Sequence, residues 1–191
     1  MTRTEESTTA TGRGHLPGDG HMWVMVLGDL VIFAGYFVIF MIYRTMNPDE
    51  FLRAQQHLAI NVGVLNTVIL LSSSWFVARA VLATRAARYE TAIRLVRTGG
   101  ALGVAFMVIK SYEWFVKIRA GHTNSEMFFS FYYVITGVHL VHVLIGLIVL
   151  GVLVRELRTR RWPSMVESGA VYWHMVDLLW IVIFGLLYVM R

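Results

Sequence analysis

Residues 127–154 read MFFSFYYVITGVHLVHVLIGLIVLGVLV and contain no Asp, Glu, Lys or Arg. An α-helix needs about 20 mostly apolar residues to cross a bilayer core of about 30 Å, so this run is long enough to span a membrane. Four more such runs are separated by charged or turn-forming residues. The sequence therefore predicts an all-α fold, a polytopic membrane bundle of five transmembrane helices. The predicted spans are residues 22–43, 58–82, 95–116, 127–154 and 170–190.

Composition limits the classes of protein that need to be considered. Of the 191 residues, 57% are hydrophobic and 15% are charged, a balance too apolar for an ordinary water-soluble domain. Because the chain has no cysteine, it has no disulfides, iron–sulfur clusters or thiolate metal sites. The net charge is +5, but the arginines lie in short stretches between apolar runs, so we expect no nucleic-acid partner.

The arginines also predict how the chain is oriented in the membrane. Residues 79–97 and 155–161 form two arginine-rich connections, and such connections remain on the cytoplasmic side. This places the N-terminus inside and the C-terminus outside. Residues 1–21 lack the basic-then-apolar order of a signal peptide, so we interpret them as a polar cytoplasmic tail. Residues 22–191 then form one transmembrane domain.

Ionisable side chains inside a span are costly and usually face protein or a water-filled cavity. The predicted spans contain Asp29, Lys110, Glu113, His139, His142, His174 and Asp177. His139 and His142 are three residues apart and share a helix face. The same spacing relates His174 to Asp177. These groups form either a metal or proton-relay site or interhelical hydrogen bonds that fix the bundle, and we favour hydrogen bonds.

Helix geometry suggests that several of these groups share one depth. With a rise of about 1.5 Å per residue, Asp29 lies about 10 Å in from the cytoplasmic end of its span. His142, His174 and Asp177 reach similar depths, so the four residues are expected to form a polar layer near the cytoplasmic side. A haem bound between His142 and His174 is a minor alternative.

Lys110 and Glu113 are three residues apart on the third span, in the outer half of the bilayer. This spacing predicts an ion pair on one helix face. A packing contact between these residues and a partner subunit is an equally supported alternative.

Two motifs then give the chain a specific resemblance. Residues 167–180 read ESGAVYWHMVDLLW, and residues 136–146 read TGVHLVHVLIG. They resemble the E-x-G-A-x-Y-W-H-x-V-D-x-x-W and T-G-x-H-x-x-H-V-x-x-G signatures of subunit III of the haem–copper oxidases, the cytochrome c oxidase superfamily. The signature residues are Gly146, Glu167, Gly169, Tyr172, Trp173 and Trp180.

Weaker matches extend this resemblance over nearly the whole membrane part. Residues 65–74, LNTVILLSSS, are similar to the family's L-N-T-x-x-L-L-x-S-S segment. Asp29 falls where the family has an intramembrane carboxylate, commonly Glu. The family often has seven helices, and this chain resembles the five-helix form that lacks the first two. In the longer form those two helices make one wall of a lipid-holding cleft.

The resemblance implies a bacterial inner-membrane subunit without haem, copper or a catalytic centre of its own. It would pack against the catalytic subunit I and against subunit II, which hold haem and copper. Its implied role is to stabilise subunit I, bind phospholipid, ease oxygen access and sustain proton uptake during aerobic electron transport. The related alternative is an accessory protein of nitric oxide reductase. More remote alternatives are a small proton-coupled transporter and a membrane haem protein.

Overall fold

The computed structural model describes residues 20–56, 58–121, 127–159 and 164–190, and every long element in them is helical. The elements are α1 (Gly20–Met46), α2 (Pro48–Gln56), α3 (Ile60–Arg85), α4 (Tyr89–Arg119), α5 (Met127–Thr159), α6 (Ser164–Phe184) and a terminal π-helix, η1 (Gly185–Val189). Within the described residues, five helices are long and apolar enough to cross a membrane. The predicted all-α fold with five spans is therefore confirmed.

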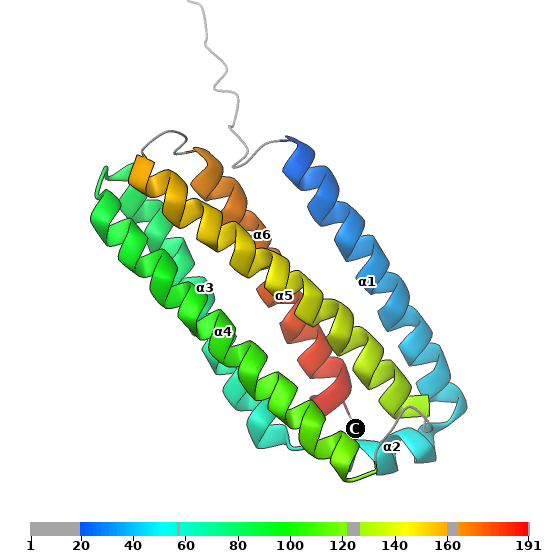
Figure 1. Cartoon of the computed structure of the whole chain (residues 1–191). Coiled ribbons are helices and arrows are strands. Elements are labelled where there is room, and N and C mark those ends of the chain that lie inside the picture. Colours follow the sequence, from blue (N-terminus) through cyan, green and yellow to red (C-terminus); the bar gives the residue numbers. More distant parts are fainter. Residues whose placement is uncertain (1–19, 57, 122–126, 160–163, 191) are drawn as a thin grey trace, which may run out of the picture.

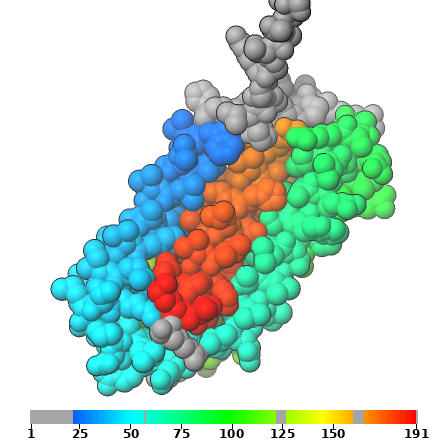
Figure 2. All heavy atoms as spheres, turned by 180° about the vertical axis from the view of Figure 1, so that it is seen from behind, coloured from blue at the N-terminus to red at the C-terminus, as the bar shows by residue number. Residues whose placement is uncertain are grey.

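Four of the long helices form a core with a square arrangement. In Figure 1, α4 and α5 lie in front of α3 and α6. Helix α3 packs against α4 and α6, and α5 packs against the same two helices, so α3 and α5 occupy opposite corners. Helix α1 lies outside this square, along α5 and α6. Figure 2, seen from behind, shows α6 between α1 and α3.

The helices extend beyond the apolar spans that the sequence predicts. The third predicted span, residues 95–116, lies inside α4, which runs from Tyr89 to Arg119. Hydropathy marks the part of a helix that matches the hydrocarbon core, whereas backbone hydrogen bonding continues into the polar headgroup region. The arginine-rich connections are correspondingly shorter than predicted.

Helix α2 is an element that the sequence analysis did not predict. Pro48 occupies its first position, where a missing backbone N–H does no harm, and Asp49 and Glu50 lie in the first turn, where the helix dipole favours negative charge. Phe51 is buried and packs edge-on against Phe40 of α1, with ring centroids 5.5 Å apart. The short helix thereby fastens one end of α1 to the bundle.

Two glycines allow close packing around Trp173 in the core. A methyl group added at Gly103 of α4 would lie 2.6 Å from the ring of Trp173, and one added at Gly146 of α5 would lie 2.8 Å from the same ring. Trp173 of α6 is therefore enclosed by two backbones. Small residues at helix interfaces are the usual means of close approach inside a bilayer.

We predict that Gly146→Ala lowers the thermal midpoint of the assembled protein, because the Trp173 ring must shift to accept the methyl group. Overpacking of this kind costs about 1–3 kcal/mol. Gly151→Ala is the matched control, since it lies on the same helix and its methyl group would meet nothing within 4 Å. Equal midpoints for the two variants, measured by thermal unfolding in detergent, would contradict the packing argument.

Candidate functional site

The most deeply buried charge in the described structure belongs to Lys110 of α4, which is 0% exposed. Its ammonium lies 3.0 Å from Glu113 Oε2, the ion pair that the spacing predicts. It also donates hydrogen bonds to the hydroxyl oxygens of Tyr132, at 2.9 Å, and Tyr188, at 2.6 Å. The Tyr188 hydroxyl in turn donates to Glu113 Oε1 at 2.8 Å. All three donors of the ammonium are therefore used, as a charge buried in a membrane requires.

Aromatic rings complete the surroundings of this ammonium. The Nζ atom lies 4.6 Å from the ring centroid of Tyr132, 5.0 Å from that of Tyr188 and 5.2 Å from that of Trp180. A cation near the face of a desolvated ring gains an attraction of about 2 kcal/mol. The cluster joins α4, α5, α6 and η1, so the ion pair has a structural role in linking these four elements.

The π-helix that carries Tyr188 is held by a side chain from α2. Gln55 is buried, and its Nε2 donates to the carbonyl oxygens of Leu186, at 3.4 Å, and Leu187, at 3.2 Å. A π-helix leaves carbonyl groups at a helix end without regular partners, and the Gln55 amide supplies donors there. Hydropathy and residue spacing indicated neither η1 nor a role for Gln55, because nothing in hydropathy marks a π-helix.

Asp29 of α1 and His142 of α5 form a second polar pair, nearer the end where the chain enters the bundle. His142 Nδ1 lies 2.8 Å from the Val138 carbonyl oxygen, which can only accept, so Nδ1 carries a proton. His142 Nε2 lies 3.5 Å from Asp29 Oδ1. The two side chains, 17% and 20% exposed, thus bring an imidazole and a carboxylate close together between α5 and α1 at the side of the bundle.

His174 and Asp177 of α6, expected in the same polar layer, have different neighbours. His174 Nδ1 lies 2.5 Å from the Ser74 hydroxyl of α3. Asp177 Oδ1 is buried and has no hydrogen-bond partner among the described residues. These residues therefore have neighbours in two directions: His142 of α5 approaches Asp29 of α1 at 3.5 Å, and His174 of α6 is hydrogen-bonded to Ser74 of α3. The hydrogen-bonded ring nitrogen of His142 contacts Val138 of its own helix, α5, and that of His174 contacts Ser74 of α3.

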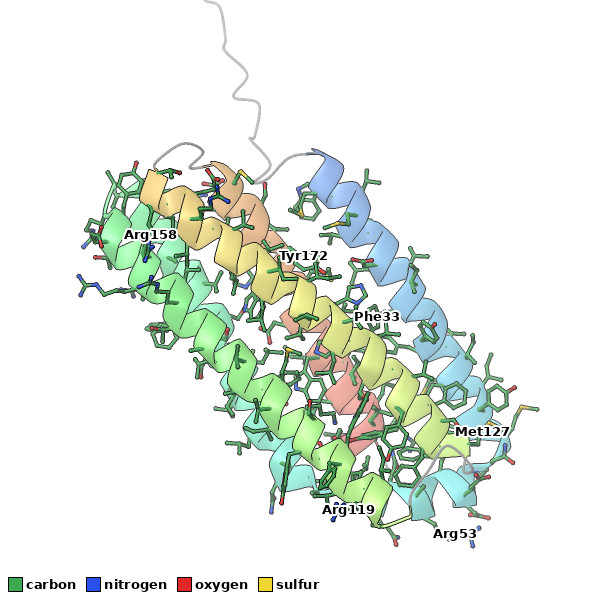
Figure 3. All side chains as sticks on the ribbon, in the orientation of Figure 1. Phe33, Arg53, Arg119, Met127, Arg158 and Tyr172 are labelled. Atoms are coloured by element: carbon green, nitrogen blue, oxygen red, sulfur yellow. The ribbon has the colours of Figure 1, made fainter. Side chains whose placement is uncertain are left out.

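The signature residues serve mainly to pack and connect the helices. Trp173 Nε1 donates to Ser73 Oγ at 3.1 Å, and Trp180 Nε1 donates to Thr67 Oγ1 at 3.1 Å. Tyr172 of α6, labelled in Figure 3, is buried, and its ring faces Gly146 of α5. Each indole on α6 therefore bonds a hydroxyl on α3.

Two further signature residues lie where α6 begins. A methyl group added at Gly169 would lie 2.7 Å from Leu153 of α5. Glu167 Oε1 accepts a hydrogen bond from Arg85 Nε of α3 at 2.9 Å, with the arginine side chain 60% exposed. An ion pair with that exposure adds little stability, about 0–1 kcal/mol.

An apolar groove of about 450 Å³ lies beside α1. It is formed by the first turns of α1 and α6 and by the stretch of α5 that precedes Arg155. Its lining is Met22, Met25, Ile148, Val149, Val152, Leu153, Met165, Ser168 and Gly169. Three of these residues are methionines, whose flexible side chains adapt to irregular apolar surfaces.

Five long apolar helices with ionisable residues paired inside the bundle define a polytopic membrane protein. No group of three or more His, Cys, Asp or Glu in the described part of the chain is placed to hold a metal ion. The sequence matches the family described as cytochrome c oxidase subunit III over residues 19–191, and the chain belongs to this family.

Curated relatives agree with this assignment. The chain is 31% identical to a cytochrome c oxidase subunit 3 of Synechocystis, over 87% of this chain and 73% of the relative. It is 26% identical to a quinol oxidase subunit 3 of Bacillus spizizenii, over 97% and 91%. It is also 30% identical to a protein of Aeropyrum pernix described as heme-copper oxidase subunit I+III, over 87% of this chain and 22% of that much longer protein.

The function follows from the family and its relatives. The chain has the role of subunit III of a haem–copper oxidase, and it is a component of an oxidoreductase complex. It is a multi-pass bacterial membrane protein. These three relatives are named as oxidase subunits, so they give no support to the alternative of a nitric oxide reductase accessory protein.

We predict that Lys110→Met destabilises the protein by about 3–5 kcal/mol, because it leaves the Glu113 carboxylate buried without its counter-charge. Adding Glu113→Gln should recover part of the loss. Arg85→Gln is the control, since it removes an ion pair that is mostly exposed. The measurement is the thermal midpoint of each variant, and a Lys110→Met midpoint equal to that of Arg85→Gln would contradict the prediction.

Proposed function

We propose that this chain packs against the catalytic subunit I of a haem–copper oxygen reductase, together with subunit II, and supports it without holding haem or copper itself. The observation that carries the proposal is the Aeropyrum pernix relative, whose description joins subunits I and III in one protein. Two subunits that occur as one polypeptide are expected to lie side by side when they are encoded separately. Oxygen reduction and proton translocation then belong to the whole complex.

The proposal includes the orientation predicted from the sequence, with the N-terminus inside and the C-terminus outside. The start of α1, the junction of α3 and α4 and the junction of α5 and α6 lie at one end of the bundle in Figure 1. The two arginine-rich connections are at these junctions. By the positive-inside rule we infer that this end faces the cytoplasm. The proposed cytoplasmic tail, residues 1–21, lies mostly outside the described residues.

We also propose that the groove beside α1 holds the acyl chain of a phospholipid. Its lining is almost wholly apolar, and Arg155 and Arg158 follow the groove on α5. Arginine binds phosphate well, since its planar group presents several donors. An anionic phospholipid would thereby fasten α1 to α5 and α6, where direct helix contacts are few.

The Asp29–His142 pair is proposed to support proton uptake on the cytoplasmic side. The proposal is supported by the 3.5 Å approach of an imidazole to a carboxylate, both partly exposed at the side of the bundle. A pair that holds the proton has no net charge, and release of the proton leaves one negative charge at the partly exposed side of the bundle. The proposed role of the wider set Asp29, His139, His142, His174 and Asp177 rests on this pair.

The partner proposal is tested by purifying the tagged chain from native membranes in mild detergent. We expect a haem–copper subunit I to be recovered in a one-to-one ratio, identified by mass spectrometry. The chain separated from its partners is expected to show no Soret absorbance. Recovery of the chain as a lone oligomer would favour a transporter, and a stoichiometric haem signal would favour a membrane haem protein.

The proton proposal is tested with Asp29→Asn in the complete oxidase. The amide is nearly the same shape and allows assembly, but it cannot share a proton with His142. We expect normal subunit content and a shorter catalytic lifetime, measured as the number of turnovers before activity is lost. Glu90→Gln on the exposed surface of α4 is the control, and a lifetime equal to that of the unmodified oxidase would remove Asp29 from the functional residues.

The lipid proposal is tested by filling the groove with Val152→Trp. Native mass spectrometry of the purified complex should show loss of a retained anionic phospholipid, with assembly preserved. Val141→Trp is the matched control, because it is an exposed valine on the same helix outside the groove. Equal lipid content in the two variants would place bound lipid elsewhere.

A further inference from the structure

Two side chains at the centre of the bundle have hydrogen-bonding atoms without partners. His139 of α5 and Asn66 of α3 are each 0% exposed. Neither ring nitrogen of His139 and neither amide atom of Asn66 has a hydrogen-bond partner in the described part of the chain. Buried polar atoms are almost always satisfied by protein or by ordered water, so four orphan atoms on two side chains need an explanation.

These two side chains come from opposite corners of the four-helix core. Helices α3 and α5 are diagonal partners, and the other diagonal is bridged by Phe106 of α4 and Trp180 of α6, whose ring centroids are 4.8 Å apart. His139 stacks on Trp180 at 5.4 Å. Asn66 precedes Thr67, which accepts the Trp180 indole N–H. Both polar groups therefore lie in the layer of the core that holds Trp180.

The hydrogen-bond donors of Trp180, Thr67 and Lys110 in this layer already bond other groups. The Trp180 indole donates to Thr67, and the Thr67 hydroxyl donates to the Gly63 carbonyl oxygen at 2.8 Å. The Lys110 ammonium, which also faces Trp180, makes three hydrogen bonds to other groups. The edge-to-face contact of His139 with Phe106 offers at most one weak N–H to ring interaction.

We propose that the core of the bundle is a binding site for buried water, held by His139 and Asn66 on the two sides of the contact between Phe106 and Trp180. A neutral imidazole has one donor and one acceptor, and an amide has two donors and one acceptor. Water offers both kinds of hydrogen bond without bringing charge into the bilayer, so it matches both side chains. The proposal is independent of the partner, lipid and proton proposals.

The test is X-ray radiolytic labelling of the complete oxidase in oxygen-18 water, read by mass spectrometry. Radiolysis converts bound water to hydroxyl radical, which oxidises the side chains next to it. Trp180 should be labelled several-fold more than Trp173. Trp173 is the internal control, because it is buried on the same helix and its indole bonds a hydroxyl on α3 as that of Trp180 does, but it is not the ring on which His139 stacks. Equal labelling of the two tryptophans would overturn the proposal.

A substitution at Asn66 gives a second test. The thermal midpoint should shift in opposite directions according to whether the Asn66 amide is unsatisfied or binds water. Asn66→Leu has nearly the same shape. If the amide is unsatisfied, removing it should raise the thermal midpoint; if it binds water, the water loses its partner, so the midpoint should fall and Trp180 labelling should decrease. Asn61→Leu, at an exposed position on the same helix, is the matched control. A raised or unchanged midpoint for Asn66→Leu would overturn the proposal.

Discussion

The structure depends on one requirement. The ammonium of Lys110 is buried away from bulk water, so the protein itself must supply all of its hydrogen-bond partners. Lys110 is fully buried, and its ammonium is bonded to Glu113, Tyr132 and Tyr188. Leaving one such partner out would expose a charge to the low-dielectric interior, so all the elements that supply partners must be in place together. Helix α2 holds the π-helix η1, which supplies Tyr188, and the Trp180 ring lies beside the ammonium.

The same principle explains why the helices adhere at all. Lipid chains are as apolar as leucine side chains, so apolar burial alone does not hold helices together in a bilayer. Here the indoles of Trp173 and Trp180 donate to hydroxyls on α3, and Gly103 and Gly146 let the helices approach Trp173 closely. Helix α1 has fewer such contacts, which is consistent with a mixed surface of lipid and partner at its side.

The fold could be predicted from the sequence because hydropathy and helix length report directly on the bilayer. The five spans and the pairing of Lys110 with Glu113 follow from run length and spacing. Contacts between helices do not, because spacing along one helix says nothing about the rotation of its neighbour. Spacing therefore did not indicate that His142 lies beside Asp29 of α1 while His174 bonds Ser74 of α3, on two sides of the bundle. The orientation and the roles of these residues stay predictions.

The hydrogen bonds of Gln55 bear on the order in which the contacts of the fold form. Gln55 lies in α2, between α1 and α3, but it bonds the carbonyl groups of Leu186 and Leu187, which are 131 and 132 residues later in the sequence. Contacts so distant in sequence form only after most of the chain has been inserted. The contact between α2 and η1 is therefore expected to form after α3, α4, α5 and α6 have been synthesised. Until then the Gln55 amide has no access to the carbonyl groups of Leu186 and Leu187.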